Sequence, residues 1–203
     1  MRTIKFLIDK DKQIKKAKET MEIYAPLADR MGMNRIRDEL EDLSFDILNP
    51  EARKLINDRL NLIKENNLTN FNSVSNEFLE LLDTNKISAK IYGREKTPFS
   101  IWRKIQSKRT SLEQITDIMG FRIILNDVSS CYKALGIFHS KWNCIPGKFK
   151  DYISSAKING YKSIHTSVIG SNKKPIEIQI RTKEMHEFAE RGIASHWKYK
   201  SSE

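Results

Sequence analysis

Apolar residues in the first 84 positions recur at helical spacing, with almost no strand pattern. Between residues 11 and 30 they fall on one face of a 3.6-residue period, at Ile14, Ala17, Met21, Tyr24, Ala25 and Ala28. Gly32 follows as a natural helix stop. Further helices are predicted over residues 35–47, 51–65 and 72–82, separated by Asn, Pro and Asn-Asn. The pattern predicts an all-helical segment over residues 1–84.

After residue 84 the pattern changes to short apolar runs between helical stretches. It predicts strands over residues 87–92, 121–125, 163–169 and 176–181, and helices over residues 98–108, 129–142 and 183–197. We therefore expect an α+β fold, in which a mixed β-sheet flanked by helices follows the helical segment. The expected organisation is a helical connector over residues 1–84 and a sheet domain over residues 85–203.

The last predicted strand has two chemically opposite faces. Its isoleucines alternate with Glu177, Gln179 and Arg181, so an acid, an amide and a base share one face. On alternation alone, a solvated sheet face explains this triplet better than a site does. Shortly upstream, residues 159–166 form a turn followed by a second strand that displays Tyr161 and His165.

Composition narrows the class of protein. The 203 residues contain no apolar run of about 18 residues and no secretory signal, so we expect a cytoplasmic protein without a membrane span. Cys131 and Cys144 lack the spacing of a zinc site or a disulfide framework. The net charge of +10 favours a polyanionic partner such as nucleic acid, a nucleotide or anionic lipid, although on composition alone basic solvated surfaces explain it better.

A basic segment between the first predicted strand and the helix at residue 98 suits phosphate. Thr97 can cap that helix and Pro98 can take its first position, which leaves backbone N–H groups facing a bound anion. The candidate ligands around this terminus are Arg94, Lys96, Ser100 and Lys104. An ordinary basic connection explains the segment equally well, and it is not a P-loop because GxxxxGK[ST] is absent.

Two carboxylates are candidates for a metal site. Asp117 precedes the apolar run at residues 118–125, and Glu177 lies on the polar face of the last strand. If the fold brings them together, the pair can bind Mg²⁺, which prefers oxygen ligands and keeps waters and substrate phosphates in its shell. Sequence spacing does not establish that proximity.

Five ordered motifs resemble the synthetase region of the RelA/SpoT family, the enzymes that make the alarmones ppGpp and pppGpp. They are GREKTPFSIWRK from Gly93, DIMGFRII from Asp117, FKDYI from Phe149, NGYKSIHT from Asn159 and EIQIRTKEMHEFAERGIASHWKYK from Glu177. The helical part, from Glu19 onward, resembles the connector that precedes the synthetase in long family members.

This resemblance implies a nucleotidyltransferase-like domain that acts in the stringent response. Such a domain moves the β,γ-pyrophosphate of ATP to the 3′-hydroxyl of GDP or GTP, with Mg²⁺ as cofactor. By motif, ATP is expected to bind Arg94, Lys96, Ser100 and Lys104. Asp117 is expected to be the main Mg²⁺ ligand and Glu177 its partner, and Glu177 also to accept the proton of the attacking hydroxyl.

The same resemblance implies an acceptor site for GDP or GTP. Tyr161 is expected to stack on guanine, while Lys150, Lys157, Asn159 and His165 contact ribose and phosphates, and Gln179 orients Glu177 or the acceptor. No nucleic acid is required. For Tyr161 the alternative is a residue that covers the sheet edge, and for His165 a hydrogen-bonded core histidine.

Departures from the family pattern concern activity and extent. Glu95 stands where proline is usual, and an acid there can weaken ATP binding; Gly120 replaces an alanine. No His-Asp dipeptide of the family's hydrolase domain occurs, so the chain resembles a fragment without hydrolase activity or carboxy-terminal regulatory domains. Whether it forms a homo-oligomer or works with a separate hydrolase stays open. The alternative functions are an inactive remnant that binds guanine nucleotides and, ranked last, an RNA-binding protein.

Overall fold

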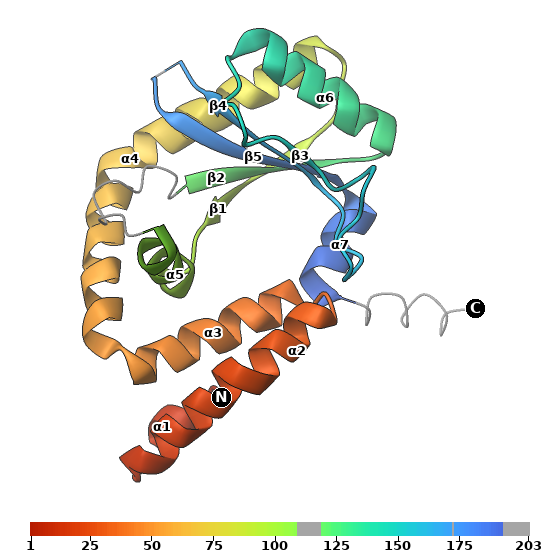
Figure 1. Cartoon of the computed structure of the whole chain (residues 1–203). Coiled ribbons are helices and arrows are strands. Elements are labelled where there is room, and N and C mark those ends of the chain that lie inside the picture. Colours follow the sequence, from red (N-terminus) through yellow and green to blue (C-terminus); the bar gives the residue numbers. More distant parts are fainter. Residues whose placement is uncertain (109–118, 172, 193–203) are drawn as a thin grey trace. The chain divides into compact units, whose positions relative to one another are not determined.

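The computed structural model describes residues 1–108, 119–171 and 173–192 (Figure 1). Contacts within the chain group it into two compact units. The first contains Met1–Leu62, Lys96–Leu112 and Phe188–Glu203, and the second contains Ile63–Glu95 and Glu113–Glu187. This grouping places residues 63–84 in the unit that holds the sheet, although they lie in the predicted helical connector. The predicted domain boundary at residue 84 stays a prediction.

The described part of the first unit is helical. Its elements are a 3₁₀ turn (Ile4–Phe6), α1 (Lys10–Glu19), a π-helical turn (Thr20–Tyr24), α2 (Ala25–Arg30), α3 (Asn34–Leu48), the beginning of α4 (Pro50–Thr84), α5 (Pro98–Lys108) and the end of α7 (Lys183–Arg191). The predicted helix over residues 11–30 is thus one helical path with a π-helical turn inside it. Pro26 has no N–H to donate to the preceding turn, which accounts for the widened turn just before it.

Gly32 ends α2 as predicted, with a φ of 71° that a glycine adopts without strain. In contrast, the prediction of two helices over residues 51–65 and 72–82 is wrong, because α4 is a single helix of 35 residues. Two adjacent asparagines cost only about 1 kcal/mol together in a helix interior relative to alanine. Burial of Val74, Phe78 and Leu82 along one face outweighs that cost.

The second unit is built around a five-stranded mixed sheet in the order β1-β2-β5-β4-β3. The strands are β1 (Lys90–Glu95), β2 (Met119–Leu125), β3 (Lys150–Asp151), β4 (Ile164–Ile169) and β5 (Pro175–Thr182). β2 and β5 pair in parallel and the other pairs are antiparallel. The predicted α+β class with a mixed sheet is therefore confirmed. The first strand begins three residues later than predicted, and β3 was not predicted.

One face of the sheet is apolar and is covered by α6 (Val128–Lys141) and the second half of α4 (Figure 1). Phe78 of α4 lies against the rings of Phe121, Phe138 and Trp142, at centroid distances of 5.1, 4.9 and 5.2 Å. The isoleucines of β5 face this core and are almost completely buried. The two-residue period of a strand then places Glu177, Gln179 and Arg181 on the other face, as predicted.

Candidate active site

Two lines of residues cross the face of the sheet opposite the apolar core. Strand register defines the first, the glutamate row, which consists of Arg94, Gly120, Glu177 and Ser167. The second, the glutamine row, consists of Tyr92, Arg122, Gln179, His165 and Lys150. The fold therefore brings five predicted site residues to one face, although they lie on four strands and up to 85 positions apart.

The centre of the glutamate row is an ion pair across a glycine. Arg94 Nη1 lies 3.9 Å from Glu177 Oε1, and the two side chains are 33% and 23% exposed. Gly120 of β2 lies between their strands and has no side chain, so Arg94 on β1 can reach over it to Glu177 on β5. The carboxylate is thus accessible from solvent and already next to a cation.

A cluster of aromatic rings lies at the end of the glutamine row. The hydroxyl of Tyr161 and Nε2 of His165 are hydrogen-bonded at 2.8 Å. The ring of Tyr152 packs edge-on against both, at 6.2 and 5.3 Å between centroids. Lys157 holds its ammonium over the rings of Tyr152 and Tyr161, at 4.9 and 5.3 Å. Asn159 caps the turn by accepting a hydrogen bond from the Tyr161 N–H at 3.2 Å.

The electrostatics of this cluster keep its histidine neutral. Burial lowers the pKa of His165 to about 4, and the positive charges of Lys157, Arg94 and Arg181 act in the same direction, against the opposite effect of Glu177. At neutral pH, His165 is therefore an uncharged hydrogen-bonding group. Tyr161 is only 9% exposed, which is compatible with the alternative that it covers the sheet edge. The hydrogen bond between Tyr161 and His165 is compatible with the alternative of a hydrogen-bonded core histidine.

Three predicted ATP ligands belong to the first unit. Thr97 caps α5 as expected, since its hydroxyl accepts a hydrogen bond from the Ser100 N–H at 3.2 Å and donates one to Ser100 Oγ at 2.9 Å. α5 packs against α3, where Phe45 contacts Phe99 at 5.6 Å between ring centroids. Ser100 and Lys104 therefore lie about one turn apart on α5, whose first turn is held by the Thr97 cap and by packing against α3. Lys96 directly precedes the cap, and the predicted metal ligand Asp117 lies outside the described residues.

Several residues near the site were not singled out from sequence. Tyr152 belongs to the quoted FKDYI motif, but only its packing against Tyr161 and His165 marks it. Ser167 pairs with Glu177 in the strand register. Arg181, by contrast, is named in the polar face of the last predicted strand, and it is 1% exposed and therefore buried. His139 of α6 is hydrogen-bonded to Thr166 Oγ1 at 2.8 Å.

The donor set suits a partly hydrated ion better than a closed metal site. Among the described residues, no group of three or more His, Cys, Asp and Glu side chains could hold a metal. Mg²⁺ typically takes one or two carboxylates and completes its shell with water and substrate phosphates. The accessible oxygen atoms of Glu177 fit one such ligand position.

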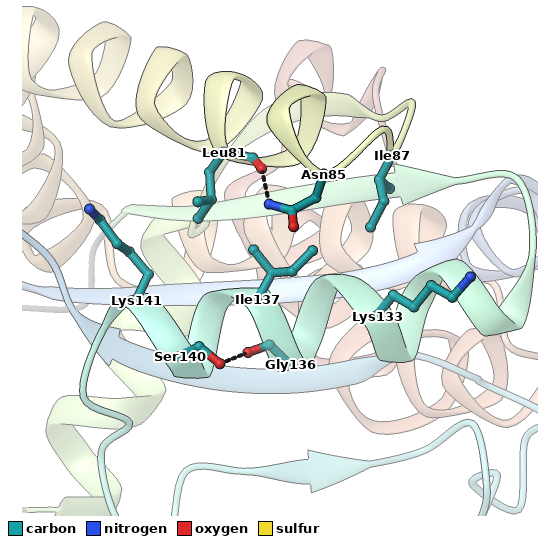
Figure 2. A pocket seen from close by; sticks show the side chains of 8 residues that line it. All are labelled: Leu81, Asn85, Ile87, Lys133, Gly136, Ile137, Ser140 and Lys141. Atoms are coloured by element: carbon teal, nitrogen blue, oxygen red, sulfur yellow. Dashed lines mark hydrogen bonds between the residues drawn. The ribbon is translucent and has the colours of Figure 1, made fainter.

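A cavity of about 600 Å³ lies in the second unit, away from the polar face of the sheet, in the layer formed by α4 and α6 (Figure 2). Leu81, Ile87 and Ile137 line it together with Lys133 and Lys141, and the amide of Asn85 is held by a 2.8 Å hydrogen bond to the Leu81 carbonyl. No predicted site residue lines this cavity. The candidate site is therefore the open polar face of the sheet and not this cavity.

Sequence comparison identifies the family. Residues 93–203 match the model of the family described as "Region found in RelA / SpoT proteins". The chain belongs to the RelA/SpoT family. Because the match begins at Gly93, it includes the glutamate row, α5 and every member of the glutamine row except Tyr92. Within the described residues of this family member, no helix is long and apolar enough to cross a membrane.

The similar curated proteins are longer. The chain is 47% identical over 200 residues to "GTP pyrophosphokinase rsh" of Brucella melitensis biotype 1, an alignment that covers 98% of this chain and 26% of that protein. It is 47% identical over 203 residues to "GTP pyrophosphokinase" of Streptomyces antibioticus, of which it covers 24%. The chain thus spans about a quarter of the length of these relatives.

Solved structures show the same fold. The small alarmone synthetase 1 from Bacillus subtilis has a TM-score of 0.53 at 23% identity, over 71% of this chain and 81% of that one. A structure of the same protein bound to its product pppGpp has a TM-score of 0.50 at 24% identity, over 72% and 82%. The RelA/SpoT chain described here therefore has the alarmone synthetase fold.

Proposed function

We propose that this chain is a synthetase that transfers the β,γ-pyrophosphate of ATP to the 3′-hydroxyl of GDP or GTP. The observation that carries the proposal is the convergence of Arg94, Glu177, His165 and Lys150 on one sheet face of a RelA/SpoT family member. The curated relatives are named GTP pyrophosphokinases, and one structural neighbour is described with pppGpp bound as its product.

On the donor side, we assign ATP to Arg94, Lys96, Ser100 and Lys104. A planar guanidinium can stack on adenine, and lysine ammonium groups neutralise phosphate charge. The capped start of α5 adds the positive end of a helix dipole.

On the acceptor side, we assign the guanine base to Tyr161. In the structure, the ammonium of Lys157 lies over that ring. A stacked base can replace this cation, and Lys157 is then available for the acceptor's phosphates. Lys150, which pairs with His165 across β3 and β4, contributes a second positive charge. Asn159 keeps the turn before Tyr161 in place, while Gln179 lies between Arg122 and His165 in the glutamine row and can orient the ribose.

The reaction needs a base, and Glu177 is the group we assign to it. The acceptor's 3′-oxygen attacks the β-phosphorus of ATP, the bond from that phosphorus to the α-phosphate oxygen breaks, and AMP leaves. The proton of the 3′-hydroxyl passes to Glu177, whose ionised form is stabilised by Arg94 at 3.9 Å. His165 does not serve as the acid near neutral pH, since its pKa is about 4.

Mg²⁺, when bound by Glu177 and Asp117, supplies charge neutralisation for the polyphosphate. The protein's own part is to hold both nucleotides in line and to accept the proton. This fits phosphoryl transfer generally, in which positioning and electrostatics account for most of the catalysis.

The test follows ³²P from the γ position of ATP into GDP and into GTP, with products separated by thin-layer chromatography. We expect labelled ppGpp or pppGpp from the wild type, none after chelation of Mg²⁺, and a loss of about 10²-fold or more in Glu177→Gln. Equal melting temperatures of both proteins exclude unfolding as the cause.

A wild type that binds GDP by calorimetry but transfers no label would instead establish the remnant alternative. Full activity of Glu177→Gln would contradict the assignment of the base. The same chromatograms report whether GDP or GTP is preferred and whether labelled product persists. The cytoplasmic location stays a prediction.

A further inference from the structure

Asp151, at the end of β3, receives hydrogen bonds from two directions. Its Oδ1 accepts the backbone N–H groups of Ile153 at 2.8 Å and Ser154 at 3.0 Å, which closes a tight turn after the strand. Its Oδ2 accepts the hydroxyl of Tyr132 at 2.9 Å. The carboxylate therefore connects the start of this turn to helix α6.

The turn held by Asp151 leads directly into the aromatic cluster. Tyr152 donates its N–H to the Ser163 carbonyl at 3.0 Å, and its ring packs edge-on against Tyr161 and His165. Lys157 donates its N–H to the Tyr161 carbonyl at 3.1 Å and holds its ammonium over the same rings. Asp151 thus directly precedes Tyr152, whose ring contacts Tyr161 and the ammonium of Lys157.

Tyr132 differs from the other residues of this region because it lies outside the five sequence motifs. It is on α6, which is anchored in the core by the fully buried Cys131, Ala134 and Phe138. The Tyr132 ring itself is 39% exposed. An anchored helix can serve as a fixed point, whereas β3 is only two residues long and offers little pairing of its own.

We propose that Tyr132 and Asp151 form a clamp that positions residues 150–161 for the guanine nucleotide. Tyr132 is a positioning residue: it acts through Asp151 and touches no group that we assign to substrate. This inference rests on the proposed acceptor site and adds to it a residue that controls acceptor affinity without affecting ATP.

The ionisation of both groups agrees with this contact. Burial acts to raise the pKa of Asp151, but the hydrogen bonds from Ser154, Tyr132 and Ile153 outweigh it and hold the pKa below its usual range. Burial and the neighbouring Asp151 raise the pKa of Tyr132. A neutral tyrosine therefore donates to an ionised carboxylate, the stronger form of such a bond.

The decisive variant is Tyr132→Phe, which removes the hydroxyl and keeps the ring. We expect KM for GDP and GTP, and the dissociation constant of GDP measured by calorimetry without ATP, to rise about 3- to 10-fold. KM for ATP and the melting temperature should change little. Amide hydrogen exchange at Ile153 and Ser154 should become faster, because the Asp151 carboxylate that accepts their hydrogen bonds is no longer held by the Tyr132 hydroxyl.

Tyr24→Phe is the matched control. It removes a tyrosine hydroxyl of similar exposure, 3.4 Å from Glu19 in the helical unit, and should leave KM for both substrates unchanged. A double-mutant cycle with Asp151→Ala tests the route of the effect: if Tyr132 acts through Asp151, Tyr132→Phe adds nothing in that background.

Unchanged acceptor KM and exchange in Tyr132→Phe would overturn the clamp, as would equal rises in KM for ATP and acceptor. Failure of the proposed function gives a different result, because it shows in the wild type as absence of transfer. If GDP still binds, its dissociation constant continues to test the clamp; if the wild type binds no GDP either, the acceptor site itself is absent. Faster exchange in Tyr132→Phe would then still establish the contact, while its role in acceptor binding would be refuted.

Discussion

Glu177 illustrates how the surroundings of one residue determine its chemistry. Its neighbours in the glutamate row are Gly120 on one side and Ser167 on the other, and Arg94 reaches it at 3.9 Å. A neighbouring guanidinium favours the charged form of a carboxylate, which weakens that carboxylate as a base. We therefore expect its basicity to depend on how substrate and Mg²⁺ redistribute charge around it.

His165 gives a prediction for stability against pH. Its pKa of about 4 lies below the value of about 6.5 expected in the unfolded chain, so between these values the unfolded chain binds more protons. Stability contributed by neutral His165 is therefore complete above about pH 6.5 and falls as the pH decreases towards 4, by on the order of 3 kcal/mol. Urea unfolding at pH 7 and pH 5 measures about 2 kcal/mol of this loss.

The control for that experiment is His165→Gln, which keeps a neutral hydrogen-bonding side chain next to Tyr161. Carboxylates elsewhere titrate equally in both proteins, so the difference between the two pH dependences isolates the histidine. An identical loss of stability in the variant would show that His165 does not have the lowered pKa.

At the scale of elements, the layer of α4 and α6 sets the position of the strands that carry the site. Phe71 of α4 stacks on Phe121 of β2, with 4.7 Å between centroids and 6° between planes. Gly93 of β1 lies against the ring of Phe71, because a Cβ added at Gly93 would be 2.3 Å from Cζ of Phe71. The glycine before Arg94 is thus required by close packing under the strand, which is a separate reason from any role in binding phosphate.

We predict that Gly93→Ala is destabilising by about 1–3 kcal/mol, since it overpacks the ring of Phe71. Gly136→Ala is the matched control, because a Cβ at Gly136 of α6 meets nothing within 4 Å. Removing a glycine from a helix interior should stabilise the protein by about 0.5–1 kcal/mol. Thermal or urea unfolding of both variants measures the two effects, and equal stability of the two would contradict the packing argument.

At the scale of the whole molecule, the excess of basic residues favours anionic ligands of every kind. The chain has 36 Lys and Arg against 26 Asp and Glu. A net charge of +10 attracts nucleotides and RNA alike at low salt, so charge cannot distinguish the synthetase from the RNA-binding alternative. Directed contacts to a base and to phosphates distinguish them, because these survive screening better than a diffuse field does.

Salt dependence therefore separates the two functions. RNA binding that depends on many phosphate contacts should weaken by orders of magnitude between 50 and 200 mM salt. GDP binding should weaken only by roughly a few-fold over the same range. Calorimetry with GDP and filter binding with RNA, at both salt concentrations, give the comparison. RNA binding that persists at 200 mM and competes with GDP would favour the alternative that we rank last.

Some of this site could be predicted from local pattern, and some could not. The alternation in β5 correctly predicted that the isoleucines face the core and Glu177 and Gln179 the other side. The asparagines of α4 were misread as a break, because local propensity is weaker than the burial of Phe78 and its neighbours. Strand β3 escaped prediction since its two residues are defined by pairing with β4 and have no periodicity of their own.

Periodicity and motif order in the chain were enough to establish the α+β class, the strand that carries Glu177 and the resemblance to RelA/SpoT synthetases, because such signals depend on neighbours a few residues apart. The meeting of Arg94 with Glu177, and of Tyr132 with Asp151, depended on the fold. Each contact joins residues on different elements, 83 and 19 positions apart. Strand register and helix packing bring such pairs together, and both are set by the burial of the whole core.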